Sequence, residues 1–169
     1  AIERLVDEIY TVHGRLDGVI HGAGVIEDAL VEDKTPESFT RVVQTKLAGA
    51  LGLTARLRPD SLKFLALFSS VAGRFGNRGQ SDYAAANGVL DKLALDLDRR
   101  WGARVVSINW GPWRTGMASE AVQRQFRERN VGLVPPAAGS RLFVDEIQRG
   151  SKGEVEVVIG DGPWPRLPD

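Results

Sequence analysis

A lysine, a serine and a tyrosine near the middle of the chain carry side chains that together suit the reduction of a ketone. Lys46 lies 24 residues before Ser70, and Tyr83 lies 13 residues after it. Ketone reduction needs an acid that protonates the developing alkoxide as hydride arrives. A free tyrosine has a pKa of about 10, which a nearby ammonium lowers toward working pH. A serine hydroxyl can hold the carbonyl oxygen as its negative charge grows. This set therefore predicts proton donation to a carbonyl that is being reduced.

Each of these residues also has a purely structural interpretation. Taken singly, Ser70 would be a cap at the end of a strand, Tyr83 a packing residue and Lys46 part of a solvated helix face. Their joint spacing favours function. Asn87 follows Tyr83 by four residues on the same helix face and would anchor a water or orient Lys46. His21 is either a strand-end histidine that bonds a backbone carbonyl or a contact to a cofactor.

The pattern of apolar residues predicts that helices and strands alternate. Apolar positions at helical spacing predict helices at 2–10, 36–57, 81–101, 118–129 and 136–148. Short apolar runs predict buried strands at 16–20, 62–68, 104–108 and 155–159. We expect Thr35 to cap the helix from residue 36 and Ser81 to cap the helix from residue 81.

This alternation predicts an α/β fold, a Rossmann-like doubly wound parallel sheet with right-handed crossovers. Ligands of such sheets bind at the carboxyl ends of the strands. The turns at 21–24, 69–80 and 109–117 all follow predicted strands, so we expect them to lie along one edge of the sheet. Ser70 and Tyr83 would then meet at that edge.

The composition excludes several functional classes. The 169 residues carry 22 basic and 22 acidic side chains, and a net charge of zero gives no support for nucleic acid or an anionic membrane as partner. The chain has no cysteine, which excludes disulfides, thiolate chemistry and cysteine zinc sites, and we expect no metal site. We expect a cytoplasmic protein, since no signal peptide or membrane-spanning run is visible.

The spacing of Ser70, Tyr83 and Asn87 resembles the short-chain dehydrogenase/reductase superfamily. Most of that superfamily carries lysine four residues after the tyrosine, where this chain has Asn87, and the lysine here is Lys46. This exchange resembles the ketoreductase (KR) domains of modular type I polyketide synthases and related polyunsaturated fatty acid synthases. Supporting strings are His21-Gly22-Ala23-Gly24-Val25, Asn87-Gly88-Val89-Leu90-Asp91 and Asn109-Trp110-Gly111-Pro112-Trp113. The resemblance extends over roughly residues 16–160.

The resemblance implies a role for each matching residue. Tyr83 would be the proton donor, Ser70 would bind the ketone, Lys46 would lower the pKa of Tyr83, and Asn87 would complete the tetrad. Residues near the cofactor would be Gly22, Ala23 and Gly24 on the adenosine side and Gly111 and Pro112 beside the nicotinamide. Residues near the substrate would be Trp113, Met117 and Phe75, next to a mobile lid formed by the helix at 118–129.

The function implied by the resemblance is NADPH-dependent reduction of a β-ketoacyl thioester to a β-hydroxyacyl thioester. The substrate would be carried by the phosphopantetheine arm of an acyl carrier protein. Two alternatives are a free-standing short-chain dehydrogenase and a non-enzymatic structural subdomain. In the family, residue types at marker positions in two loops correlate with the stereochemistry of the product. The residues at 26–28 and Phe75 occupy the marker positions here, and they favour the D-hydroxy product.

The sequence departs from the family at the phosphate-binding turn. A complete reductase begins with a strand and a glycine-rich turn that cradles pyrophosphate at a helix N-terminus. No Gly-x-Gly-x-x-Gly occurs near the start of this chain. We therefore expect residues 1–160 to be the C-terminal portion of a catalytic domain, without its N-terminal strands, and residues 161–169 to be a linker. Alone, this portion would be inactive, and its further partner would be the N-terminal part of the same domain.

Overall fold

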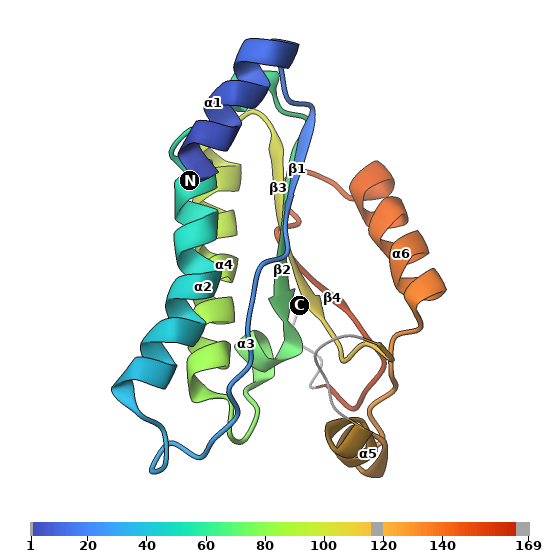
Figure 1. The fold of residues 1–169 in the computed structure, drawn as a ribbon. Helices are drawn as coiled ribbons and strands as arrows, with labels where there is room; N and C mark the ends of the chain where they lie inside the picture. The colour runs from blue at the N-terminus through green and yellow to red at the C-terminus, as the bar shows by residue number, and fades with distance from the viewer. Residues whose placement is uncertain (1, 116–119, 165–169) are drawn as a thin grey trace.

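Four parallel strands form the centre of the molecule (Figure 1). The computed structural model describes residues 2–115 and 120–164. The strands are β1 (Gly18–His21), β2 (Phe64–Ser70), β3 (Arg104–Trp110) and β4 (Glu156–Ile159), and they lie in the order β1-β2-β3-β4. Since all neighbours are parallel, every strand ends at the same edge of the sheet. The predicted α/β fold is confirmed.

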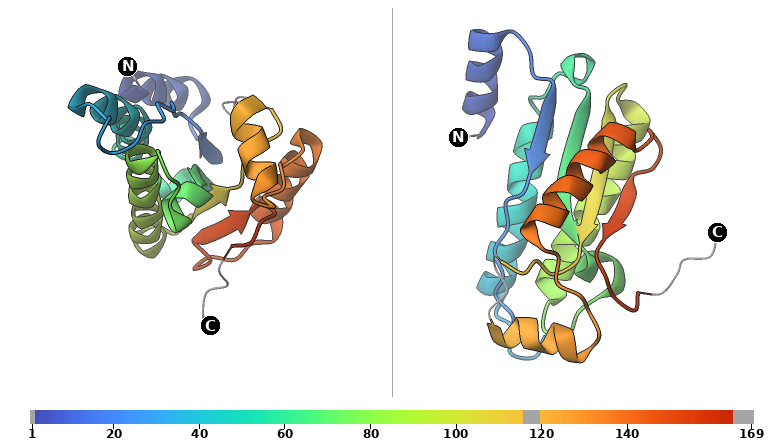
Figure 2. Two further views of the ribbon diagram at one scale, coloured as in Figure 1. Left: turned by 90° about the horizontal axis from the view of Figure 1, so that it is seen from below. Right: turned by 90° about the vertical axis from the view of Figure 1, so that its right-hand side faces the viewer.

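Helices lie on both faces of the sheet (Figures 1 and 2). One face carries α1 (Ile2–His13), α2 (Pro36–Thr54) and α4 (Ser81–Arg100), and the other carries α6 (Pro136–Arg149). The short helix α3 (Val71–Phe75) and helix α5 (Glu120–Glu128) lie beyond the carboxyl ends of the strands. A single turn of 3-10 helix, Pro59–Ser61, precedes β2.

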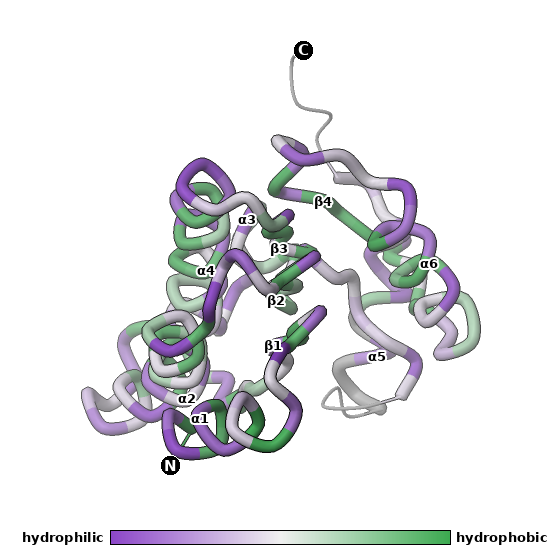
Figure 3. The backbone as a smooth tube through the Cα atoms, turned by 90° about the horizontal axis from the view of Figure 1, so that it is seen from above, coloured by the Kyte–Doolittle hydropathy of each residue, from purple (hydrophilic) through white to green (hydrophobic). Residues whose placement is uncertain are grey.

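The core consists of two layers separated by the sheet. Between the sheet and the α1, α2 and α4 side, the buried residues are aliphatic apart from Tyr10, with Leu65, Leu90 and Val105 among them. On the α6 side, Ile108 and Trp110 pack beneath the helix. In Figure 3 the strands lie between the two groups of helices, and much of their length is hydrophobic. All seven residues of β3 are buried, as expected for a central parallel strand.

The first residue of α4 is Ser81, so the expectation that Ser81 is its cap was wrong. Gln80 occupies the cap position, and its side chain makes no capping hydrogen bond. The Asp82 carboxylate instead accepts from the backbone N–H of Tyr83, at 2.8 Å. The Thr35 cap of α2 is confirmed, since its hydroxyl accepts from the Ser38 N–H at 3.2 Å.

The segment expected as one glycine-rich loop begins with the helix α3. Strand β2 runs to Ser70, whose hydroxyl caps α3 by accepting from the Ala72 N–H at 3.2 Å. The helix ends at Phe75. The next residue, Gly76, has a φ of 75°, a left-handed conformation that glycine adopts readily. The expected start of α5 at residue 118 lies outside the described residues.

Both outer strands of the sheet, β1 and β4, have an unpaired edge in the described part of the chain. Strand β1 pairs only with β2, and its Ile20 side chain is 51% exposed. In the same described residues no helix is long and apolar enough to span a membrane. Residues 2–115 and 120–164 also contain no cluster of three or more histidine or acidic side chains that could hold a metal ion.

Candidate active site

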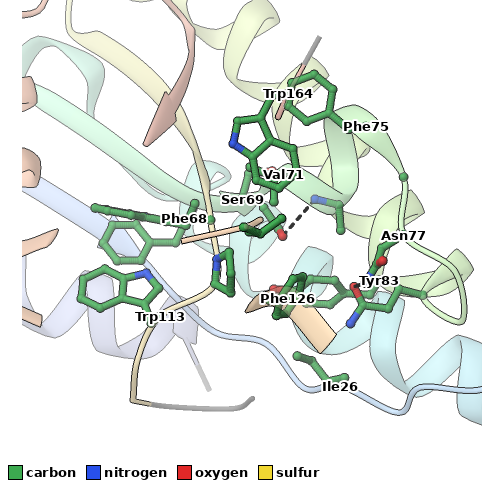
Figure 4. Close-up of a pocket in the computed structure, with 18 of the residues that line it drawn as sticks. Ile26, Phe68, Ser69, Val71, Phe75, Asn77, Tyr83, Trp113, Phe126 and Trp164 are labelled. Carbon is green, nitrogen blue, oxygen red and sulfur yellow. Dashed lines mark hydrogen bonds between the residues drawn. The ribbon is translucent and has the colours of Figure 1, made fainter. Parts of the chain in front are cut away.

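A cavity of about 470 Å³ opens at the carboxyl edge of the sheet (Figure 4). Its wall is formed by the ends of β2 and β3, by α3, by the first turn of α4 and by the loop that follows β1. Of the predicted site residues, those that line it are Lys46, Ser70, Tyr83, Phe75, Gly22, Gly111, Pro112 and Trp113. The topology therefore brings together residues that are up to 91 positions apart in the chain.

Tyr83 lies in the first turn of α4, where its ring is 8% exposed and faces the cavity. Burial raises the pKa of its phenol, whereas the neighbouring Ser70 and Asn87 side chains lower it, and the negative charge of Asp28 raises it further. The pKa of Tyr83 is therefore above its ordinary value in this structure. The lowering that we expect from Lys46 stays a prediction.

Lys46 reaches the cavity from the middle of α2 and is 3% exposed. Its ammonium lies 5.5 Å from the centroid of the Tyr83 ring and donates a hydrogen bond to the Phe68 carbonyl at 2.9 Å. Burial lowers the pKa of Lys46 to about 8, and the negative charge of Asp91 opposes this change. Lys46 thus stands beside Tyr83 as a cation that titrates near neutral pH.

Ser70 is both a helix cap and a residue of the cavity wall. Its hydroxyl oxygen accepts the Ala72 N–H, so the hydroxyl proton can be donated to the phenol oxygen of Tyr83 or to a ligand. The structural and functional interpretations of Ser70 are therefore compatible. Because the cap sets the direction of the side chain, the hydroxyl is held close to the phenol of Tyr83.

Asn87 lies behind Tyr83, is fully buried and is not among the described residues that line the cavity. Its amide donates to the Tyr83 carbonyl at 2.7 Å, while its Oδ1 has no partner in the described part of the chain. A Cβ on Gly73 would lie 2.7 Å from the Cβ of Asn87, so α3 packs directly on α4 at this point. A buried amide oxygen without a partner is costly, which is consistent with its use by a bound water or ligand.

The geometry of His21 supports the structural one of its two interpretations. Its Nε2 lies 2.8 Å from the Lys46 carbonyl, and burial lowers the pKa of the imidazole. A Cβ on Gly49 would lie 2.7 Å from His21 Cε1, so only glycine leaves room for the ring. His21 therefore ties the end of β1 to the turn of α2 that carries Lys46.

Only some of the residues expected near the cofactor line the cavity. Gly22, Gly111 and Pro112 line the cavity, whereas Ala23 and Gly24 are not among its described lining residues. A Cβ on Gly24 would still lie 3.4 Å from Lys46 Nζ. A Cβ on Gly111 would lie 3.1 Å from the backbone of residue 160, so that glycine also has a packing reason.

Aromatic rings form the apolar walls of the cavity (Figure 4). Trp113 is in contact with the ring of Trp110, with centroids 4.8 Å apart, and it fills the space above Gly139 of α6. Phe75 stacks on Trp164, with centroids 5.4 Å apart and planes 6° from parallel. Met117, also expected near the substrate, lies outside the described residues.

Trp164 belongs to the segment expected to be a linker, and sequence reasoning did not connect it with the site. The sequence feature that could have indicated a role for Trp164 is its position between two prolines at 163–165, but this pattern also suits an extended linker. Residue 161 is held by a hydrogen bond from the Gly132 N–H at 2.7 Å, which directs the following residues back across the cavity. The position of the ring depends on this long-range contact, which no local pattern reveals.

The loop from Gly22 to Lys34 is fastened to the start of α4 beside Tyr83. Asp28 lines the cavity and accepts two hydrogen bonds from the Gln80 amide, at 3.0 and 3.1 Å. The Lys34 ammonium pairs with Asp82 at 2.7 Å, and both side chains are buried. Sequence reasoning missed this pair because a lysine in a charged loop is usually solvated. Such a pair fixes the loop relative to the catalytic tyrosine expected next to it.

Comparison with known proteins assigns the family. A family model described as the KR domain matches residues 1–115. One component of a polyunsaturated fatty acid synthase from Thraustochytrium sp. is 41% identical over 152 residues, which is 90% of this chain and 5% of that protein. A polyketide synthase of Streptomyces halstedii is 42% identical over 131 residues, which is 76% of this chain and 2% of that protein. The chain thus spans only a small part of these relatives.

Solved structures agree with this assignment. A ketoreductase from the first module of phoslactomycin biosynthesis in Streptomyces sp. HK803 superposes with a TM-score of 0.86 at 32% identity, over 96% of this chain and 37% of that one. A short-chain dehydrogenase from Streptomyces avermitilis has a TM-score of 0.80 at 19% identity, over 94% of this chain and 66% of that one, and it shares the fold. The chain belongs to the KR domain family of ketoreductases, found in polyketide and polyunsaturated fatty acid synthases.

Proposed function

We propose that this chain supplies the proton-donating portion of a reductase that uses NADPH to convert a β-ketoacyl thioester into a β-hydroxyacyl thioester. The observation that carries the proposal is the meeting of Tyr83, Ser70 and Lys46 in one cavity at the carboxyl edge of the sheet. The relatives are multidomain synthases, which supports an acyl carrier protein as the partner that presents the substrate.

The cavity fits a nicotinamide cofactor through Lys46. The Lys46 ammonium has three donors, and its described hydrogen bond to Phe68 uses one of them. Donors are thus available for the hydroxyls of a ribose. The Oδ1 of Asn87, which has no partner among the described residues, is buried behind the cavity wall and suits an ordered water instead. NADPH would supply hydride to the ketone carbon.

The residues of the chain would handle the proton. The Ser70 hydroxyl donates a hydrogen bond to the ketone oxygen, which gains negative charge as hydride arrives. The Tyr83 O–H bond then breaks, its proton passes to that oxygen, and the phenol becomes a phenolate. The positive charge of Lys46 stabilises this phenolate. The rings of Phe75, Trp113 and Trp164 keep water from the reacting carbonyl.

Substitution of the two tyrosines tests the function in the synthase that contains this chain. With an acetoacetyl thioester as substrate, Tyr83→Phe is expected to lower kcat by roughly 10²–10⁴-fold, the usual contribution of general acid catalysis. Tyr10, the second of the two tyrosines, lies on α1 with its hydroxyl 3.3 Å from Ser61 Oγ and is not among the described lining residues, so Tyr10→Phe serves as the matched control. Consumption of NADPH is followed at equal concentrations of folded protein. A Tyr83→Phe enzyme with nearly full activity would refute the proposal.

We further infer that the 169 residues bind NADPH weakly by themselves. In residues 2–115 and 120–164, no Gly-x-Gly-x-x-Gly turn joins a strand to a helix N-terminus. The loop that follows β1 reaches its next helix only at Pro36. The backbone N–H groups that usually hold a pyrophosphate are therefore not presented by this loop. The reductase activity then belongs to a larger unit.

A further inference from the structure

A buried ion pair joins the loop that follows β1 to the helix that carries Tyr83. The Lys34 ammonium lies 2.7 Å from Asp82 Oδ2, and the two side chains are 3% and 1% exposed. No other ion pair among residues 2–115 and 120–164 is as deeply buried on both sides. Desolvation of two charges can cost more than their attraction returns. The pair therefore matters more for how the two segments are arranged than for the stability of the fold.

Both partners of this pair are also bonded to the backbone. The Lys34 ammonium donates to the Glu27 carbonyl at 2.6 Å, which joins two residues of the loop that are seven positions apart. The second carboxylate oxygen of Asp82 accepts the Tyr83 N–H at 2.8 Å. Asp82 lies in the first turn of α4, where the positive end of the helix dipole favours a negative charge. The pair thus holds a closed loop against the turn that carries Tyr83.

Two further contacts fasten the same loop to the segment that leads into α4. The Ala29 N–H donates to the Gly79 carbonyl at 3.0 Å. The Gln80 amide donates to both carboxylate oxygens of Asp28, and its own carbonyl oxygen accepts from Asn77 at 3.0 Å. The loop is therefore attached at three points, and the ion pair is the attachment next to Tyr83 in the chain.

The attached loop supplies part of the cavity wall. Ile26 and Asp28 both line the cavity, and Ile26 packs against the small buried cluster that contains Tyr83. Between Gly22 and Lys34 the loop has no helix or strand of its own. Because backbone pairing does not hold this segment, its polar contacts with the start of α4 set where the wall lies.

We propose that Lys34 and Asp82 are positioning residues of this site, which hold the wall formed by Ile26 and Asp28 in register with Tyr83. This role rests on the proposed reductase function and deepens it, since the wall faces the space in which the ketone would bind. Neither residue is among the described residues that line the cavity. The pair therefore acts on substrate binding through the loop and takes no part in proton transfer.

Steady-state kinetics of Lys34→Met, in the synthase that contains this chain, test this role. Methionine keeps a long unbranched side chain but cannot pair with Asp82. With an acetoacetyl thioester as substrate, we expect kcat/KM to fall by up to about 10²-fold, with most of the loss in KM, because the binding wall is misplaced. Destabilisation alone would reduce the amount of folded enzyme and leave KM unchanged, so KM separates positioning from stability. An unchanged KM in Lys34→Met would overturn the proposal.

An exposed ion pair of the same loop offers a matched control. Arg41 on α2 bonds the Glu27 carboxylate at 2.6 and 2.8 Å, and the two side chains are 58% and 32% exposed. Exposed pairs contribute little, so Arg41→Met should change KM by less than about twofold. If Arg41→Met raised KM as much as Lys34→Met does, the buried pair would have no special role and the proposal would fail.

A double variant covers the case in which Lys34→Met does not fold. The single change leaves Asp82 buried without its opposite charge, whereas Lys34→Met with Asp82→Leu leaves no unpaired charge and is often neutral for stability. Apolar side chains cannot replace the bonds to the Glu27 carbonyl and the Tyr83 N–H. KM should therefore stay raised in the double variant even though its stability returns. A KM equal to that of the parent would show that packing alone holds the loop, against the proposal.

Hydrogen exchange of the loop provides a readout that needs no activity. In the same synthase, mass spectrometry follows exchange in the segment 25–34, which contains the Ala29 N–H, and in β3 as an internal reference. In Lys34→Met the loop should exchange at least about tenfold faster than in the parent, while β3 stays protected. Unchanged exchange in the loop would overturn the proposal whether or not the synthase reduces a ketone. Inactivity of the parent with every β-ketoacyl thioester, together with faster loop exchange in the variant, would contradict only the reductase function.

Discussion

Lys46 shows how a single residue can oppose the stability of the fold that holds it. The ammonium is buried beside an aromatic ring, and burial lowers its pKa from 10.5 to about 8. A lowered pKa of a basic group means that the folded protein holds the charged form at a cost. The cost is greatest below pH 8, where Lys46 is charged in both the folded and unfolded states.

This cost predicts a pH-dependent effect of Lys46→Met on the free energy of unfolding. Between about pH 8 and pH 10.5 the unfolded chain holds the Lys46 proton more tightly than the folded one, so the parent protein gains stability as pH rises. The gain is about 3 kcal/mol. The variant lacks this gain, so its stability relative to the parent should fall by that amount over the window.

Urea unfolding at several pH values measures this difference. Lys92→Met is the control, since that side chain is 70% exposed and its removal should give a difference that hardly depends on pH. If the free energy of unfolding of Lys46→Met differs from that of the parent by the same amount across the window, the pKa of Lys46 in the folded protein is close to the ordinary value of a lysine.

At this scale, sequence reasoning found the residues whose chemistry is distinctive. Ser70 and Tyr83 were predicted to meet because the turns that follow parallel strands share one edge, and Lys46 was joined to them by its spacing and by the family resemblance. The structure brings all three to one cavity. The burial of Asp91 and its hydrogen bonds to β3 could not be predicted. Its partners, Ser107 and Asn109, belong to a different element, and the sequence alone does not distinguish a buried aspartate in a helix from a solvated one.

A glycine sets how closely helix α2, which packs on α4, approaches β1. Gly49 faces β1 and leaves room for the His21 ring, which bonds the carbonyl of Lys46. The same helix carries Gly52, where a Cβ would lie an ordinary 3.7 Å from Ile2. The two glycines therefore differ in whether the structure requires them.

Alanine substitution at these positions should have opposite effects. Gly49→Ala places a methyl group 2.7 Å from His21 Cε1 and is expected to destabilise the protein by about 1–3 kcal/mol through overpacking. Gly52→Ala removes a glycine from the interior of α2 and should stabilise the protein by up to about 1 kcal/mol. Chemical denaturation of both variants provides the comparison. A Gly49→Ala protein as stable as the parent would mean that α2 can move away from β1 without cost.

The sequence predicted the bounds of helices and strands well in the core of the molecule and less well near the cavity. Strand β2 continues to Ser70, two residues beyond the predicted end, because Ser69 and Ser70 pair with Asn109 and Trp110 of β3. Polar residues at the end of an apolar run look like a loop, although in a parallel sheet the ladder can continue through them. Helix α3 was missed for a related reason, since a five-residue helix rich in small residues has no periodicity to detect.

In the described part of the molecule, helices cover both faces of the sheet, whereas each of its two outer strands pairs with a single neighbour. One of them, β1, carries the exposed Ile20. The alternation of elements predicted this parallel sheet, and the lack of a glycine-rich turn predicted that N-terminal strands would be absent from it. The return of Trp164 across the cavity could not be predicted, because it depends on packing between segments far apart in the chain.

The open sheet leads to a prediction about cofactor affinity. The isolated 169-residue chain should bind NADPH weakly or not at all, since the described residues present no turn for its pyrophosphate. Isothermal titration calorimetry on the chain, with the complete synthase domain as the positive control, measures this. Tight binding by the chain alone would show that the cavity holds the cofactor without a pyrophosphate cradle.

The aromatic walls of the cavity give this protein an optical signal of its own. Three of its four tryptophans, at positions 110, 113 and 164, line the cavity, while Trp101 lies at the opposite end of the sheet between α4 and β3. A reduced nicotinamide absorbs light in the region where indole emits, so its arrival would quench these three fluorophores by energy transfer. An acyl chain that separated the stacked rings of Trp164 and Phe75 would change the emission of Trp164 without this energy transfer. We therefore expect NADPH and an acyl substrate to change the emission spectrum in different ways.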